Sequence, residues 1–237
     1  MELRNASSSS YIVVLRHGHS EQPEGVPSAL LPHPLTAKGR RQSEGAILTL
    51  RAILKGHNLT LHPSIDTSPS LRAWETAEII RQGLAKSGKA SPLLSEVDNL
   101  TERSLGAMAN LSIDEIEAVM ERDPRYQVPS EGWKSNSWYR LPFTGSESLM
   151  ESGIRVASHL QLVATEIKGT GKLKIIVGHG ASLRHAALCL GILKPSEVPA
   201  LSMHHGSPLL LEKRDDGKWT RIKGEWKLRL PLSEGME

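Results

Sequence analysis

The chain has 237 residues, with 23% charged and 38% hydrophobic side chains, as in an ordinary globular protein with a layered core. The formal charge of +3 comes from scattered Lys and Arg residues, which excludes a dense basic interface for nucleic acid. The single cysteine, Cys189, excludes an intrachain disulfide framework, and no segment approaches the length of a membrane span.

Residues 1–10 are polar and Ser-rich, and they predict a loose arm in front of one domain over residues 11–237. The arm lacks the apolar core of a signal peptide, and the lone cysteine fits a reducing compartment. We therefore expect a cytoplasmic protein with neither a membrane nor a nucleic acid as partner. The oligomeric state stays open.

A run of apolar, mostly β-branched residues at positions 11–15 predicts a buried strand that ends in Arg16-His17-Gly18. A loop with several Pro and Gly residues follows, and Thr36 caps a helix that extends to about residue 54. A short strand near 65–67 leads into Ser68-Pro69, which we read as the N-cap and first residue of the next helix.

The second half continues the alternation of strands and helices. We expect a strand at 93–96, a helix near 113–121, a polar Trp-rich excursion over the surface at 130–144, a helix at 149–167, a strand at 174–177, a helix at 181–190 and a last strand at 209–211. Apolar strands alternating with amphipathic helices predict an α/β three-layer sandwich, with a mostly parallel central sheet and helices on both faces.

Two of the predicted buried strands end in similar sequences, Arg16-His17-Gly18 and Gly178-His179-Gly180. Because the carboxyl ends of parallel strands lie at one edge of a sheet, we expect His17 and His179 to meet in one crevice.

Arg72 falls in the first turn of the helix after Pro69, where free N–H groups and the helix dipole suit a phosphate. The guanidinium groups of Arg16 and Arg72 match phosphate oxygens, and Gly180 lets another helix begin close to the same anion. These residues predict a pocket for a dianionic phosphoryl group.

Catalysis in such a pocket requires a nucleophile and a proton donor. A histidine nitrogen can attack phosphorus and form a covalent intermediate. Glu102 follows a predicted strand at the same edge and is a candidate general acid, although a solvated loop carboxylate is the simpler reading of its position.

Other polar residues carry weaker expectations. Ser20, Arg103 and His204 are candidates for substrate contacts, with local loop hydrogen bonding as the alternative. The ten histidines include no pair with a helical metal-ligand spacing and a matching carboxylate. We therefore expect no metal site and no cofactor.

Four stretches of the chain resemble, in order, the signatures of the histidine phosphatase superfamily, the phosphoglycerate mutase-like group. They are Leu15-Arg16-His17-Gly18-His19-Ser20, Thr67-Ser68-Pro69-Ser70-Leu71-Arg72-Ala73-Trp74-Glu75-Thr76-Ala77, Leu100-Thr101-Glu102-Arg103-Ser104-Leu105-Gly106 and Gly178-His179-Gly180-Ala181-Ser182-Leu183-Arg184. That family also has similar sequences at two further positions, which here are Ser146-Glu147-Ser148-Leu149 and Gly206-Ser207-Pro208.

The resemblance implies that His17 is the phosphorylated nucleophile and Glu102 the proton donor. It further implies that Arg16, Arg72 and His179 bind the transferred phosphoryl group, without a metal ion. We expect a phosphatase that hydrolyses a small phosphomonoester through phosphohistidine. The alternatives are a phosphoglycerate mutase and a non-catalytic binding or scaffolding relative. The loops at 19–34 and 107–145, which would determine the leaving group, have no clear match in the family, so the sequence does not identify that group.

Overall fold

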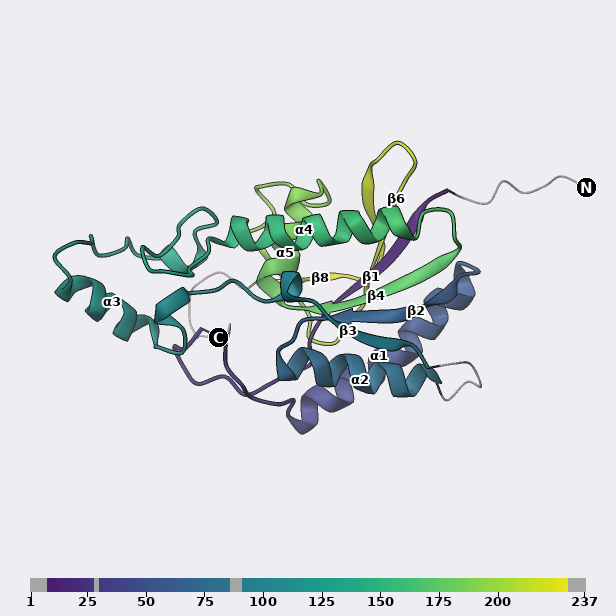
Figure 1. Cartoon of the computed structure of the whole chain (residues 1–237), viewed down its shortest axis with the longest axis horizontal. Coiled ribbons are helices and arrows are strands. Elements are labelled where there is room, and N and C mark those ends of the chain that lie inside the picture. The colour runs from purple at the N-terminus through teal and green to yellow at the C-terminus, as the bar shows by residue number, and fades with distance from the viewer. Residues whose placement is uncertain (1–7, 28–29, 86–90, 230–237) are drawn as a thin grey trace, which may run out of the picture.

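A computed structural model of the protein describes residues 8–27, 30–85 and 91–229, so most of the expected N-terminal arm lies outside the described residues. One sheet of six strands runs through the centre (Figure 1). Its strands are β1 (Ser10–Arg16), β2 (Thr60–Thr67), β3 (Leu93–Glu96), β4 (Lys172–Gly178), β6 (Leu209–Lys213) and β7 (Trp219–Lys223).

The strands lie in the order β3-β2-β4-β1-β6-β7. Neighbours from β3 to β1 are parallel, whereas β6 and β7 add an antiparallel edge beyond β1. The apolar first strand therefore sits inside the sheet, beside β4, as its lack of polar alternation predicts. This arrangement brings the carboxyl ends of β1 and β4 to the same edge.

Helices cover both faces of the sheet. They are α1 (Ala37–Gly56), α2 (Leu71–Ala85), α3 (Ile113–Arg122), α4 (Leu149–Glu166) and α5 (Gly180–Cys189). Figure 1 shows α1 and α2 below the sheet and α4 above it. Alternate residues of β1 supply the two cores, because Val13 and Leu15 pack with α1 and α2 while Ile12 and Val14 pack with α4 and α5. The predicted three-layer α/β architecture is confirmed.

The polar segment at 130–144 runs mostly over the surface, as expected, but it is anchored by two buried side chains. Trp133 is buried, and its indole N–H donates to Glu117 Oε1 of α3 at 2.8 Å. Together with Leu141, Ile116 and Met120 it forms a small separate core beyond the end of the sheet. A stretch of mostly polar residues thus folds over α3 and is held there by a few apolar side chains. The hydrophobic periodicity of the sequence does not reveal this packing.

Two further expectations were wrong. Helix α2 begins at Leu71, so Ser68 and Pro69 lie in the preceding turn, where Ser68 is buried. The strand at 209–211 is not the last one, since β7 and then β8 (Trp226–Leu228) follow, and β8 pairs with the short β5 (Leu201–Met203) in a second sheet. Among the described residues, no helix is long and apolar enough to cross a membrane.

Candidate active site

The adjacent ends of β1 and β4 bring His17 and His179 together. Arg16 pairs with Gly178 in the parallel ladder, and the amide of His17 donates to the Gly178 carbonyl at 3.0 Å. The two imidazole rings are both buried, with their centroids 5.1 Å apart. The expected juxtaposition of the two strand-end histidines is therefore present in the structure.

The hydrogen bonds of His17 define which ring nitrogen carries the proton. Its Nδ1 lies 2.6 Å from the carbonyl oxygen of Gly18, which can only accept, so Nδ1 is the donor. Its Nε2 accepts from Nε of Arg72 at 3.2 Å. Burial, together with His179, Arg72 and Arg16, holds the pKa of His17 well below its ordinary value. His17 is thus a neutral imidazole with an Nε2 lone pair, the form that a nucleophile requires.

Arg72 connects this ring to its neighbours from the first turn of α2. Its Nη2 lies 3.2 Å from Nδ1 of His179, and its Nη1 donates to the Leu31 carbonyl at 2.9 Å. Nε2 of His179 faces the hydroxyls of Ser68 and Ser70 at 2.9 and 3.2 Å. Burial and then the charge of Arg72 lower the pKa of His179 to about 3.

Arg16 and Gly180 meet at the start of α5. Nη1 of Arg16 donates to the Met203 carbonyl at 3.2 Å. A Cβ atom on Gly180 would lie 3.1 Å from Cδ and 3.2 Å from Nε of Arg16, so the glycine leaves the room that the arginine occupies. Gly180 therefore serves the close approach of a cation to a helix N-terminus.

Glu102 accepts three backbone hydrogen bonds at the same helix end. Oε1 accepts from the amides of Arg103 and Ser182 at 2.9 Å, and Oε2 accepts from Ala181 at 3.0 Å. Burial acts to raise the pKa of Glu102, but His179 and the three backbone donors outweigh it and lower that pKa. With its pKa below the ordinary value, Glu102 is a carboxylate in the free site.

The remaining predicted residues lie at varying distances from His17. His204 is exposed, and its neighbour His205 instead places its ring 5.4 Å from that of His17 and bonds the His17 carbonyl at 2.9 Å through Nδ1. Ser20 pairs its backbone with Leu35 at the base of the loop after β1. Arg103 is buried and lines a neighbouring cavity.

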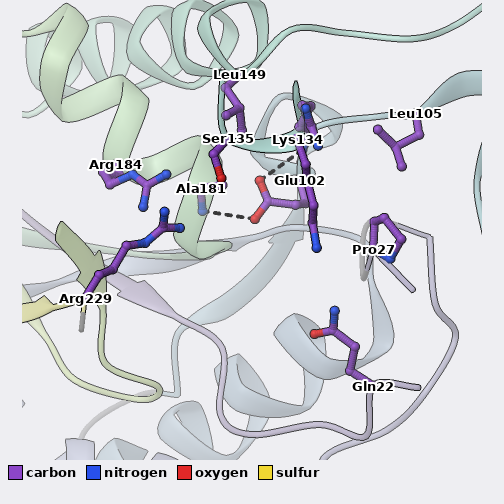
Figure 2. Close-up of a pocket in the computed structure, with 11 residues that line it drawn as sticks. Gln22, Pro27, Glu102, Leu105, Lys134, Ser135, Leu149, Ala181, Arg184 and Arg229 are labelled. Atoms are coloured by element: carbon purple, nitrogen blue, oxygen red, sulfur yellow. Dashed lines mark hydrogen bonds between the residues drawn. The ribbon is translucent and has the colours of Figure 1, made fainter. Parts of the chain in front are cut away.

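This cavity has a volume of about 140 Å³ and lies beside Glu102 and the first residue of α5 after Gly180 (Figure 2). Three of its lining residues, Lys134, Arg184 and Arg229, come from three different parts of the chain. Sequence reasoning missed Lys134 and Arg229 because neither lies in a motif. Arg184, Ser68 and Ser70 lie in stretches that resemble the family signatures, but the sequence assigned none of them a role in the site. In the described part of the chain, no three His, Cys, Asp or Glu side chains are grouped to hold a metal ion.

Four histidines whose pKa is strongly lowered by burial predict acid sensitivity of the fold. Burial is the largest cause that lowers the pKa of His17, of His179 and His205 to about 3 and of His185 to about 4. In the unfolded chain each takes up a proton as the pH falls through about 6.5, whereas the native state does not. Stability is therefore lost as the pH falls below that value. We expect denaturant titrations to show a loss of about 2 kcal/mol per histidine, roughly 8 kcal/mol in all, between pH 7 and pH 5.

The substitution His185→Gln should remove about one quarter of this pH dependence. The same change at the exposed His57 should leave it intact. An unfolding free energy that stays constant between pH 7 and pH 5 would contradict the assignment of neutral buried rings.

Residues 12–223 match the histidine phosphatase superfamily (branch 1). The 2,3-bisphosphoglycerate-dependent phosphoglycerate mutase of Lachnoclostridium phytofermentans is 27% identical over 228 residues, covering 88% of each chain. The enzyme of that name from Cytophaga hutchinsonii is 30% identical over 204 residues, covering 85% of this chain and 86% of that protein.

Two solved structures share the fold at lower identity. Native mycobacterial glucosyl-3-phosphoglycerate phosphatase is 21% identical with a TM-score of 0.65, covering 93% of this chain and 97% of that one. Phosphoglycerate mutase from Bacillus anthracis is 17% identical with a TM-score of 0.67, covering 92% and 93%. With the family match spanning both strand-end histidines and nearly all of the sheet, this chain belongs to the histidine phosphatase superfamily, branch 1.

Proposed function

We propose that the protein is a phosphatase that hydrolyses a small phosphomonoester through a phosphohistidine intermediate on His17. The observation that carries this proposal is the state of the His17 ring. Its Nδ1–H is held by the Gly18 carbonyl, and its Nε2 lone pair faces Arg72. A fixed, neutral imidazole beside two guanidinium groups suits attack on a phosphoryl dianion.

The reaction has two half-steps. Nε2 of His17 attacks phosphorus, the P–O ester bond breaks, and Glu102 gives its proton to the leaving oxygen. Water then attacks the phosphohistidine, Glu102 accepts a proton from that water, and inorganic phosphate leaves. Arg16, Arg72 and His179 bind the equatorial oxygens, and the two guanidinium groups stabilise their negative charge. We propose that these groups suffice without a metal ion or a cofactor.

The proton on Glu102 comes with the substrate. The free site holds Glu102 as a carboxylate, but a phosphoryl dianion bound nearby places negative charge beside it and raises its pKa. A substrate that arrives as the monoanion supplies the proton directly. The carboxylate thus becomes an acid only in the complex, where the acid is required.

Trapping of the intermediate tests the proposal. Wild-type protein quenched within milliseconds of mixing with a ³²P-labelled phosphomonoester should carry label that is lost in acid and kept in alkali. Peptide mapping should place this label on His17. Label on a Ser, Asp or Cys side chain, or turnover without any labelled protein, would contradict the mechanism.

The second candidate is a phosphoglycerate mutase, favoured by the names of relatives that align over most of their length. A mutase must keep water from the phosphohistidine and hold a bisphosphorylated intermediate while it reorients. In the mutases that this chain resembles, the loop after the first histidine carries an Asn. Here Pro23 stands at that position, exposed and without a side-chain donor, which supports the phosphatase.

Partition between the two reactions is measurable in one assay. We supply 3-phosphoglycerate with catalytic 2,3-bisphosphoglycerate and follow 2-phosphoglycerate and free phosphate together, beside a panel of other phosphomonoesters. We expect phosphate release to exceed isomerisation for at least one ester of the panel. Isomerisation that far outpaces the hydrolysis of every ester would reverse the assignment.

A further inference from the structure

The loop that carries Glu102 has no regular structure of its own. Residues 101–104 belong to neither a helix nor a strand, so contacts with other segments must set the position of their backbone. On one side of the loop, the carboxylate of Glu102 reaches the first amides of α5 (Figure 2). On the other side, the side chains of Glu147, in the turn before α4, and Arg155, in the second turn of α4, hold the backbone.

Arg155 binds the part of the loop that leads into Glu102. Its Nε and Nη2 donate to Oε1 and Oε2 of Glu147 at 2.9 and 2.8 Å. Its Nη1 donates to the carbonyls of Asn99 at 2.9 Å and Thr101 at 3.2 Å. Side chains on a helix lean toward its N-terminus, which brings Arg155 back to a carboxylate eight residues earlier. All three guanidinium nitrogens therefore form hydrogen bonds.

Glu147 extends this contact to the other side of Glu102. Its Oε2 accepts from the amide of Ser104 at 3.1 Å, and its own amide donates to the Ser104 carbonyl at 2.9 Å. The two side chains of the Arg155–Glu147 pair are only 20% and 23% exposed, so little water competes with their bidentate contact. The pair thus fixes the backbone both before and after the proposed proton donor.

A fixed backbone matters because the Glu102 carboxylate has two tasks. In the free site its oxygens accept from three backbone amides. To protonate the leaving oxygen, one of them must lie within hydrogen-bond reach of the substrate. With the backbone fixed, a small side-chain rotation exchanges these partners. Drift of the loop would instead misplace the acid, and a displacement of about 1 Å can cost on the order of 100-fold in rate.

We propose that Arg155, through its bidentate pair with Glu147, is a positioning residue that keeps Glu102 within reach of the leaving oxygen. The inference rests on the proposed phosphatase function. Arginine suits this role because its planar fork spans a carboxylate and two carbonyls at once, which the single ammonium group of a lysine does not. Arg155→Lys therefore removes the geometry and keeps the charge.

Keeping the charge is necessary because it is felt inside the phosphoryl site. Burial and the charge of Arg72 are the main causes that lower the pKa of His179, and the charge of Arg155 adds to them. A neutral substitution would change this electrostatic effect together with the position of the loop. The lysine variant separates the two.

Amide hydrogen exchange in the resting full-length protein tests the positioning without turnover. The amides of Ala181 and Ser182 lie in the first turn of α5, where no helical carbonyl can accept from them, and both donate to Glu102. Their exchange therefore reports how firmly the carboxylate is held. We expect Arg155→Lys to speed the exchange of both amides by at least about 10-fold, as followed by NMR.

Kinetics with two leaving groups test whether this position serves proton donation. Arg155→Lys should lower kcat by about 10- to 100-fold with an alkyl phosphate and by less than about 3-fold with nitrophenyl phosphate, whose leaving group needs no proton. In the Glu102→Gln background the same change should have little further effect, because no acid is left to position. Glu147→Gln breaks the pair from its other side and should reproduce the pattern.

The matched control is Arg81→Lys. Arg81 forms another bidentate pair, with Glu78 on α2, and the two side chains are 30% and 18% exposed. This variant makes the same chemical change away from the Glu102 loop, so it should keep wild-type exchange at the start of α5 and wild-type rates with both esters. Thermal unfolding of each variant checks the fold.

Unchanged exchange of the Ala181 and Ser182 amides in Arg155→Lys would overturn the inference. Equal losses of kcat with the two leaving groups would also overturn it, and would leave the Arg155–Glu147 pair a stabilising ion pair alone. Wild-type protein that releases no phosphate from any ester, while amide exchange responds as expected, would refute the proposed phosphatase function and leave the positioning of Glu102 standing.

Discussion

Replacement of His17 by Gln is expected to reduce phosphate release by at least roughly 10⁴-fold, because it removes the Nε2 lone pair that attacks phosphorus in the proposed mechanism. The amide is similar in size to the ring and can keep a hydrogen bond to Arg72, but it cannot form a stable bond to phosphorus. Residual hydrolysis would come from direct attack of water on a phosphoryl group still held by Arg16 and Arg72. Initial rates with a saturating ester, compared with labelled intermediate per mole of protein, measure both effects.

The matched control is His57→Gln, at the exposed C-terminal end of α1. It makes the same chemical change far from the strand ends and should retain wild-type rates. His17→Gln protein that unfolds at the wild-type temperature and still binds phosphate, but does not turn over, would separate chemistry from folding. Activity within a few-fold of wild type in this variant would exclude His17 as the nucleophile.

The meeting of His17 with His179 was predictable because it depends on two local patterns and one general rule. Each histidine follows an apolar run, and parallel strands end on the same edge. The first turn of α2 was also correctly given as the position of Arg72, although the helix begins two residues after Pro69. The catalytic roles of these residues stay predictions, since geometry alone does not test them.

Other parts of the site depend on contacts that no local pattern encodes. Ser68 looks like a helix cap in sequence, but its hydroxyl is 2.9 Å from His179, which lies 111 residues away along the chain. Lys134 reaches the cavity because Trp133 is anchored in the small core around α3. Arg229 arrives there through β8, a strand too short to show a period. Tertiary packing, rather than composition, places these three.

The Glu102→Gln variant is expected to lose about 10²- to 10⁴-fold in rate with alkyl phosphates, whose leaving oxygen needs a proton. The loss should be much smaller with nitrophenyl phosphate, because nitrophenolate leaves without one. The neutral amide also removes the carboxylate that accepts from Ala181 and Ser182 at the start of α5. That structural effect cannot depend on the leaving group, so a plot of rate against leaving-group pKa isolates the proton-donor role.

A second carboxylate offers the matched control for helix capping. Glu151 accepts from the amide of Ser148 in the capping box of α4, and Glu151→Gln should alter stability without changing the slope of that plot. For Glu102→Gln, the slope should become steeper than in the wild type, since poor leaving groups lose their acid. Equal losses with good and poor leaving groups would assign Glu102 to positioning the start of α5. The proton would then have to come from the substrate monoanion or from water.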